Sequence, residues 1–282
     1  MNITTLIENR PSETDSDLQS EWGLSLHISH NGHAILFDTG SSGAFAHNAE
    51  RLSVDLKIIE AVVLSHHHFD HGGGLRKFFE LNRRAKVYLG QAPDGDCHAK
   101  ILHLFKKYIG LDKSLIPQYS DRFVTIETIT EILPDVFVFP QIFDNHPKPK
   151  GNKHLYLIKD GKVSPDHFKH EIIMAIKNAG KVVVFTGCSH NGILNMIDTV
   201  AQTFSGMPIQ AVVGGFHLVA SPPFHGMAGS KSDVQDLGRS VLNYPVGMTY
   251  TGHCTGEKAF RVLKSVMGSR LADIKTGSVF EI

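Results

Sequence analysis

The sequence predicts an α/β fold in which strands and helices alternate along the chain. Three segments share one pattern, in which a run of apolar and β-branched residues ends in a polar turn and a helical pattern follows. These segments are "KIIEAVVL" with "LRKFFELNRR", "KVVVFTG" with "ILNMIDTVAQTF", and "VGMTYTG" with "EKAFRVLKSVMG". Alternation of this kind is typical of layered proteins in which helices pack on sheets.

The N-terminal part of the sequence predicts antiparallel strands. The stretch "GLSLHISHNGHAILFDTG" contains two short β-rich runs that are joined by "HNGH". Asn31-Gly32 at the centre of this stretch is a strong signal for a two-residue turn, because both residues tolerate positive φ angles. We therefore expect a β-hairpin here.

The middle of the sequence, from about 91 to 165, is less regular. "CHAKILHLFKKYIG" predicts a helix, "RFVTIETITEI" and "VFVFPQIF" predict strands, and "DNHPKPKGNKH" has the Pro, Gly and Lys content of an exposed loop. No clean domain boundary is evident. We expect a single domain over residues 1–282, with an insertion or a cap over a site within about 91–165.

Composition narrows the class of protein and its partners. Of the 282 residues, 41% are hydrophobic and 20% are charged, which predicts a folded globular chain. Lys and Arg (28) balance Asp and Glu (28), so we expect neither nucleic acid nor a membrane as a partner. The three cysteines form no spaced framework, and the N-terminus has neither a basic start nor an apolar core. These features predict a cytoplasmic protein.

Histidine is unusually frequent, with 18 residues against 7 Met and 6 Tyr. Four predicted strands end in loops that carry histidine: His66, His68, Asp70 and His71 after strand 61–64; Cys188 and His190 after 182–185; His217 after 211–213; and His253 after 248–250. In α/β sheets, ligands bind beyond the carboxyl ends of the strands, so these residues are expected to converge on one site.

The first of these loops divides into two pairs of candidate ligands. His66 and His68 are two residues apart, so in extended backbone they point to the same side and could bind one metal ion. Asp70 and His71 lie where the chain turns into a helix, and could bind a second ion. The glycines that follow permit a sharp turn, and N–H groups at the helix start could hold an anionic group of a substrate; these glycines include Gly73 and Gly74.

Other positions stay open on the residues alone. Cys188 is a small buried residue, a thiolate ligand or a partner of a ligand. His217 is a metal ligand, a substrate contact or a polar loop residue. His170 and Glu171 precede a predicted strand, where a single His-Glu pair is normally a surface pair. His225 is interpreted as a residue of a polar loop.

The motif "HHHFDH" resembles the signature of the metallo-β-lactamase-fold superfamily, and "ILFDTG" is similar to the strand-end turn that precedes it there. The likeness covers nearly the whole chain. "LIENR", "WGLSL", "FKHE", "FTGCSHNGILN", "GGFHL" and "GHCTG" resemble the branch of 7,8-dihydropterin-6-methyl-4-(β-D-ribofuranosyl)aminobenzene-5′-phosphate synthases. The resemblance implies a four-layer αββα sandwich, with a metal site at the edge where the strand-end loops gather.

The resemblance also implies a set of metal ligands. His66 and His68 would bind a first metal ion. Asp70, His71 and His253 would bind a second.

The chain departs from the commoner members of the superfamily at one point. Those members have a third histidine before a strand and a bridging Asp in a "TGD" turn, whereas this chain has Cys188 in "TGC". The third ligand of the first ion is therefore His190 or His170, and the bridge is a water molecule, Cys188 or both. We favour His190, because it lies in the "TGCSH" motif of the branch.

This ligand set predicts metal chemistry on a small, anionic molecule. Zn²⁺ is the expected cofactor, as one or two ions, with Mn²⁺ or Fe²⁺ as alternatives. The leading hypothesis is a hydrolase in which metal-bound hydroxide attacks a small phosphorylated or ester substrate. Asp70 would then be both ligand and proton acceptor, and His217 would stabilise developing negative charge or bind a phosphate.

Two other functions are kept as alternatives. One is the synthase reaction of the branch, written as condensation of an aminobenzoate with phosphoribosyl pyrophosphate with decarboxylation. The other is a non-catalytic sensor that binds a metal or a small molecule on the same fold. Product formation from the two synthase substrates would identify the first, and tight binding of a product-like ligand without turnover would identify the second.

Overall fold

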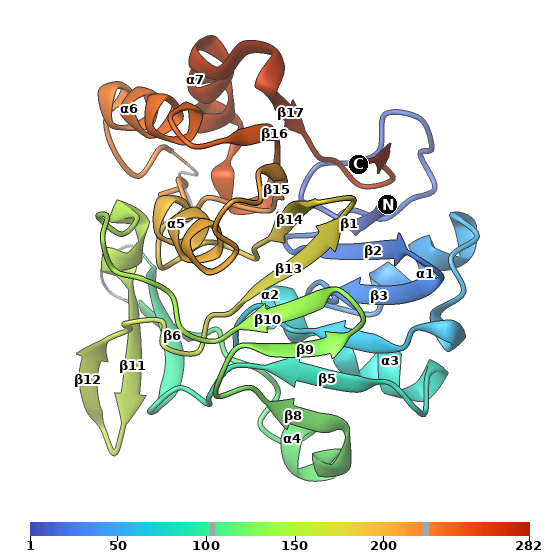
Figure 1. Ribbon diagram of the computed structural model, residues 1–282. Helices are drawn as coiled ribbons and strands as arrows, with labels where there is room; N and C mark the ends of the chain where they lie inside the picture. Colours follow the sequence, from blue (N-terminus) through green and yellow to red (C-terminus); the bar gives the residue numbers. More distant parts are fainter. Residues whose placement is uncertain (102–104, 221–225) are drawn as a thin grey trace.

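The computed structural model describes residues 1–101, 105–220 and 226–282. Its centre is a pair of seven-stranded mixed sheets (Figure 1). The first sheet has the order β18-β1-β2-β3-β4-β5-β8. Its strands are β1 (Asn2–Ile7), β2 (Ser25–His30), β3 (His33–Phe37), β4 (Ala61–Val63), β5 (Lys86–Leu89), β8 (Phe123–Thr125) and β18 (Val279–Glu281).

The second sheet has the order β17-β16-β15-β14-β13-β10-β9. Its strands are β9 (Thr130–Leu133), β10 (Val136–Phe139), β13 (Ile173–Asn178), β14 (Lys181–Phe185), β15 (Ile209–Val213), β16 (Val246–Thr251) and β17 (Leu271–Asp273). Strands β14 to β17 run parallel to one another, so the carboxyl ends of these strands lie at one edge of the sheet.

Alternating side chains of the strands build three apolar layers. In β14, Val183 and Phe185 pack between the two sheets, whereas Val182 and Val184 pack on the opposite face. The opposite face of the second sheet is covered by α5 (Ile193–Thr203), α6 (Lys231–Leu242) and α7 (Glu257–Met267). The outer face of the first sheet is covered by α1 (Ala44–Arg51), α3 (Leu75–Leu81) and α4 (Leu115–Gln118). This arrangement confirms the predicted αββα sandwich.

A smaller third sheet lies beside the sandwich, at the left of Figure 1. Its order is β12-β11-β6-β7, built from β6 (Asp96–Ile101), β7 (Phe105–Tyr108), β11 (Leu155–Lys159) and β12 (Lys162–Pro165). The helix expected over 97–110 is therefore wrong. Pairing of β6 with β11 supplies backbone hydrogen bonds that outweigh the helix propensity of Ala99 and Lys100.

The N-terminal hairpin forms where the sequence predicts it. Strands β2 and β3 pair with His30 opposite His33, which leaves Asn31 and Gly32 as the turn. Their φ angles are +49° and +85°, as a turn with two left-handed residues requires.

No helix of the described residues is long and apolar enough to cross a membrane. The three cysteines are free and buried. His225, interpreted above as a polar loop residue, lies outside the described residues.

Candidate metal centre

The loops after four strands bring the predicted residues together at one edge of the sandwich. The loop after β4 contains His66 and His68, and the short helix α2 (Phe69–Gly72) adds Asp70 and His71. From the facing sheet, the ends of β14, β15 and β16 contribute the remaining residues of the site: Cys188, His190, His217 and His253.

Three histidines form what we call the first half-cluster: His66, His68 and His190. Their ring nitrogens lie within 4.8 Å of one another, and His66 Nε2 is 3.0 Å from His68 Nδ1. All three side chains are buried. The geometry therefore groups His190, rather than His170, with the His66–His68 pair.

Four residues form the second half-cluster: Asp70, His71, Cys188 and His253. His71 Nε2 is 3.2 Å from both His253 Nε2 and Cys188 Sγ. Asp70 Oδ2 lies 3.5 Å from His253 Nε2 and 3.8 Å from His71 Nε2. Cys188 also lies in one donor group with His66 and His71 and in another with His190 and His217. Its thiol therefore lies between the two half-clusters.

A buried carboxylate fixes the ring protons of two histidines. Asp38 Oδ2 accepts hydrogen bonds from His71 Nδ1 (2.6 Å) and from Ser65 Oγ (2.8 Å). Because the Ser65 hydroxyl donates to Asp38, it accepts from His66 Nδ1 at 2.9 Å. In their neutral forms both imidazoles therefore carry the proton on Nδ1, and Nε2 of each presents a lone pair to the cluster.

Two asparagines fix the other two histidines in the same way. Asn9 Oδ1 accepts from Gly23 N–H (3.0 Å) and faces His253 Nδ1 at 2.9 Å. Asn152 donates from Nδ2 to the carbonyl of His190, so Oδ1 is the atom that faces His190 Nδ1 at 3.1 Å. Asn9 and Asn152 therefore hold Nε2 of His253 and His190 unprotonated.

The residues present fit a metal ion. Nε2 of His71 and of His253 lie 3.2 Å apart, so a cation beside them could be bound by both rings once Nε2 of His71 is unprotonated. Among the described residues, the buried atoms His68 Nε2, His190 Nε2 and His217 Nδ1 have no hydrogen-bond partner. Buried polar atoms rarely lack a partner unless an ion or water serves as one. The His, Asp and Cys groups could thus hold a metal ion.

Burial determines the charge of the histidines in the metal-free protein. It lowers the pKa of His66, His68, His190 and His253 well below the usual value, so these rings are neutral and able to bind a metal. For His71, burial acts in the same direction, but the carboxylates of Asp38 and Asp70 outweigh it and raise the pKa.

We expect metal-free protein to lose stability as the pH falls from 7 to 5. Burial lowers the pKa of His67 to about 3 and of His217 to about 4. Below pH 6.5 the unfolded chain therefore binds protons that the folded chain does not, which costs about 2 kcal/mol per histidine at pH 5. Glu171, whose pKa burial raises to about 6, opposes this by at most about 2 kcal/mol.

Urea unfolding of chelator-treated protein at pH 7, 6 and 5 measures this dependence. The free energy of unfolding should fall by at least about 2 kcal/mol across the range, and His67→Asn should reduce the slope. A free energy that is independent of pH would contradict the neutral, buried state of these rings.

The structure places several other predicted residues outside the half-clusters. Glu171 accepts the backbone N–H groups of His190 and Asn191 at 2.8 and 2.7 Å, so it orients the loop after β14. His170 is hydrogen-bonded to Asp166 at 3.0 Å and belongs to a separate group. Both are buried rather than the surface pair expected from sequence.

Gly73 and Gly74 pack against the loop at 39–42. A Cβ atom on Gly73 would lie 2.1 Å from the carbonyl oxygen of Ser41, and one on Gly74 would lie 2.3 Å from that of Thr39. Close backbone packing therefore explains these glycines. Neither glycine lines the cavity described below, so their contact with a substrate stays a prediction.

Left-handed backbone is concentrated around the site. His217 (φ +48°), His253 (+49°), Phe168 (+55°), Asp38 (+58°) and Ser189 (+58°) all adopt it without being glycine. Such residues carry backbone strain, and strain of this kind clusters at functional sites.

A cavity of about 400 Å³ opens onto both half-clusters. His68, Asp70, Cys188, His190 and His217 line its floor. Its remaining walls are mostly apolar. Ala99, Lys107 and Leu155 come from the third sheet, and other parts of the chain contribute Trp22, Phe69, Ile109 and Val219. A cavity of this size suits a small organic molecule with a polar end at the metal site.

Sequence reasoning missed several residues of the site. Trp22 donates from Nε1 to Asp70 Oδ2 at 2.9 Å, and Cys254 accepts from His217 N–H at 3.3 Å. Asn9 and Asn152 lie far from the histidine motifs in the sequence. Three of them lie in motifs that resemble the branch, Asn9 in "LIENR", Trp22 in "WGLSL" and Cys254 in "GHCTG", whereas Asn152 lies in none of them.

Comparisons with known proteins extend this picture. The 7,8-dihydropterin-6-methyl-4-(beta-D-ribofuranosyl)-aminobenzene-5'-phosphate synthase of Methanocaldococcus jannaschii is 29% identical, over 92% of this chain and 89% of its own. The crystal structure of Tm1679, described as a metal-dependent hydrolase of the beta-lactamase superfamily, has a TM-score of 0.81 at 28% identity, over 100% of this chain and 99% of its own. Zn²⁺-bound PqqB from Methylobacterium extorquens has a TM-score of 0.60 at 12% identity over the whole of both chains, which shows the fold alone.

The comparison with the synthase corrects the predicted activity. We expected a hydrolase, whereas this relative is an enzyme that synthesises a phosphorylated product. The hydrolase prediction is therefore wrong, and the synthase alternative is the better supported of the two. The error has a simple origin, because a fold and a His/Asp cluster do not by themselves select the groups that react.

The match that assigns the chain to a family covers more than half of its length. The family model described as the metallo-beta-lactamase superfamily matches residues 23–253, a range that contains both half-clusters. The αββα sandwich and the histidines at the ends of its strands agree with this match. The chain belongs to the metallo-beta-lactamase superfamily.

Proposed function

We propose that this protein is a metal-dependent synthase that joins a 7,8-dihydropterin, through its 6-methyl carbon, to the amine of 4-(β-D-ribofuranosyl)aminobenzene 5′-phosphate. The reaction is taken from the product in the name of the M. jannaschii relative. That product contains a dihydropterin as well as the ribosylated aminobenzene. Bond formation between these two halves therefore accounts for it more fully than attack of an aminobenzoate on phosphoribosyl pyrophosphate.

The proposed reaction is a displacement. The arylamine nitrogen attacks the methyl carbon and a C–N bond forms. A diphosphate-type leaving group departs with the electron pair of the broken C–O bond, and the nitrogen loses one proton. The site must therefore bind two aromatic systems and phosphate groups, and must accept a proton.

The observation that carries the proposal is that the cavity combines apolar walls with a positively charged side chain. Trp22, Phe69 and Ile109 give it apolar surface against which an aromatic ring can pack. Lys107 lines the same cavity with its ammonium 5.4 Å from the centre of the Phe69 ring, and can pair with a phosphate. Apolar walls beside a cation match the ribosylated aminobenzene phosphate.

Asp70 is suited to accept the proton of the arylamine. Its carboxylate lines the cavity and is held by Trp22 Nε1 at 2.9 Å. Burial raises the pKa of Asp70, which makes it a stronger base than an exposed carboxylate. His217 is neutral because burial lowers its pKa to about 4, and its Nδ1 is suited to hydrogen-bond a phosphate oxygen. A metal ion held by the half-clusters would supply positive charge for the phosphate oxygens of the leaving group.

Product formation tests the proposal directly. Metal-loaded protein is incubated with (7,8-dihydropterin-6-yl)methyl diphosphate and 4-(β-D-ribofuranosyl)aminobenzene 5′-phosphate, and the joined product is detected by mass spectrometry. We expect product with the wild-type chain and with the surface variant Asp112→Asn, and none with Asp70→Asn. Tight binding of the product without turnover at any metal loading would instead identify a non-catalytic binding protein and overturn the proposal.

Replacing Lys107 by methionine is expected to raise KM for the ribosylated aminobenzene phosphate about 10- to 100-fold with little change in kcat. The reason is the loss of a charge-assisted hydrogen bond, worth roughly 1.5–3 kcal/mol. Lys106→Met on the same strand is the matched control, because Lys106 does not line the cavity. If both substitutions raised KM equally, Lys107 would act only through the net charge of β7 and not by direct contact with the phosphate.

A further inference from the structure

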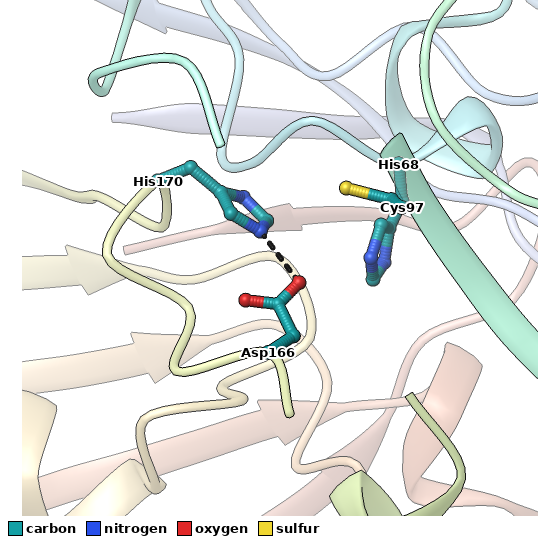
Figure 2. Close-up of side chains that lie close together, drawn as sticks. All are labelled: His68, Cys97, Asp166 and His170. Carbon is teal, nitrogen blue, oxygen red and sulfur yellow. Dashed lines mark hydrogen bonds and ion pairs between the residues drawn. The ribbon is translucent and has the colours of Figure 1, made fainter. Parts of the chain in front are cut away.

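A second group of buried metal-binding side chains lies directly behind the first half-cluster. We call His68, Cys97, Asp166 and His170 the accessory cluster. One donor atom from each lies within 4.8 Å of the others, and all four side chains are buried. Figure 2 shows them around one space, with the His170–Asp166 hydrogen bond on one side and His68 and Cys97 on the other.

His68 belongs to both clusters and has one nitrogen for each. Nδ1 faces His66 Nε2 at 3.0 Å in the first half-cluster. Nε2 is buried and has no hydrogen-bond partner in the described part of the chain. Imidazole binds metal ions through either nitrogen, and once both ring protons are lost the imidazolate binds one ion through each, so Nε2 can serve the accessory cluster while Nδ1 serves the first half-cluster.

The hydrogen bonds of the cluster assign different roles to Asp166 and His170. The backbone N–H of His67 donates to His170 Nδ1 at 3.3 Å, so His170 carries its proton on Nε2 and donates it to Asp166 Oδ2 at 3.0 Å. Asp166 Oδ1 accepts the N–H of Phe168 at 2.7 Å. These bonds hold the carboxylate in place, and each of its oxygens keeps a lone pair for a further partner.

We propose that His68 Nε2, Cys97 Sγ and the Asp166 carboxylate form a second metal-binding site, with His170 orienting Asp166. The nitrogen, sulfur and oxygen donors suit a borderline-soft divalent ion such as Zn²⁺. The thiol loses its proton to solvent when the ion binds, and His68 loses its ring proton in the same way and bridges the ions of the two clusters as an imidazolate. The thiolate and the carboxylate then balance the two positive charges, as burial among apolar side chains requires.

The accessory cluster lies between the third sheet and the loop that carries the first half-cluster. Cys97 of β6 packs with Leu157 of β11 and with Ile109, which directly follows β7. Ile109 N–H donates to the carbonyl of Cys97, and Phe69 N–H donates to the carbonyl of Ile109, each at 2.9 Å. An ion shared by Cys97 and His68 would therefore join the third sheet to the loop that carries the first half-cluster.

Titration of the metal-free full chain with Co²⁺ alone tests the proposal without using activity. A thiolate bound to Co²⁺ gives a charge-transfer band in the near ultraviolet, which reports on each cysteine separately when Cys97→Ser and Cys188→Ser are compared. We expect Cys97→Ser to bind one Co²⁺ fewer per chain than the wild type and to lose part of this band. His98→Gln, on the same strand, should bind the wild-type number.

Asp166→Asn provides a second variant in case Cys97→Ser does not fold, and it should lose the same equivalent. If the number of bound ions and the band are unchanged in both variants, the accessory cluster is only a group of buried polar side chains, and the proposal is overturned. Because no catalytic readout enters, this result is independent of whether the synthase reaction is found.

Discussion

Replacing His190 by alanine is expected to remove one metal ion per chain and to lower the rate of product formation more than about 100-fold. Its Nε2 is a buried donor of the first half-cluster without a partner among the described residues, and Asn152 holds it unprotonated. Loss of a residue that merely supports a ligand costs about 10- to 100-fold in metal affinity or activity. Loss of the ligand itself should therefore cost more.

His170→Ala is the matched comparison, because sequence alone left His170 and His190 as rivals for this position. The structure pairs His170 with Asp166 instead, so this variant should retain the ion of the first half-cluster and most of the activity. Elemental analysis and the initial rate of product formation measure both effects. If His170→Ala, and not His190→Ala, were the variant that lost the ion, the assignment of the first half-cluster would be wrong.

The parts of this fold that depend on local sequence patterns could be predicted from the sequence. The turn at Asn31-Gly32 follows from the φ angles that the two residues tolerate, and β14 and β15 follow from runs of β-branched residues. Convergence of the strand-end histidines follows from the geometry of parallel strands. None of these features needs information about distant parts of the chain.

The parts that could not be predicted from the sequence depend on contacts between residues far apart in the chain. The segment over 97–110 has helical propensity, but β11, more than 50 residues later in the chain, pairs with it and makes it a strand. Asn9 binds His253 across 244 residues, and no local pattern marks that partnership. His170 and Glu171 looked like a surface pair because burial depends on the loops that cover them.

Replacing Asp38 by asparagine should weaken metal binding and destabilise the metal-free protein, although Asp38 is not itself a member of either half-cluster. Asp38 Oδ1 accepts Ser65 N–H at 2.7 Å, and Oδ2 accepts both the Ser65 hydroxyl and His71 Nδ1. An amide group in place of Oδ2 would present hydrogens to two donors. His71 would then shift its proton to Nε2 and lose the lone pair that faces His253.

The expected result for Asp38→Asn is a 10- to 100-fold loss of Zn²⁺ affinity, measured by competition with a chromophoric chelator, because the proton on His71 must be displaced before a metal ion binds. The metal-free variant should also lose about 1–3 kcal/mol of stability to urea, the cost of an unsatisfied buried donor. Asp112→Asn is the control, because its ion pair with Arg76 is exposed and should contribute little. An unchanged Zn²⁺ affinity in Asp38→Asn would mean that the carboxylate does not set the tautomer of His71. The assignment of the Nδ1 proton to neutral His71, and with it the unprotonated Nε2 that the second half-cluster offers to an ion, would then be wrong.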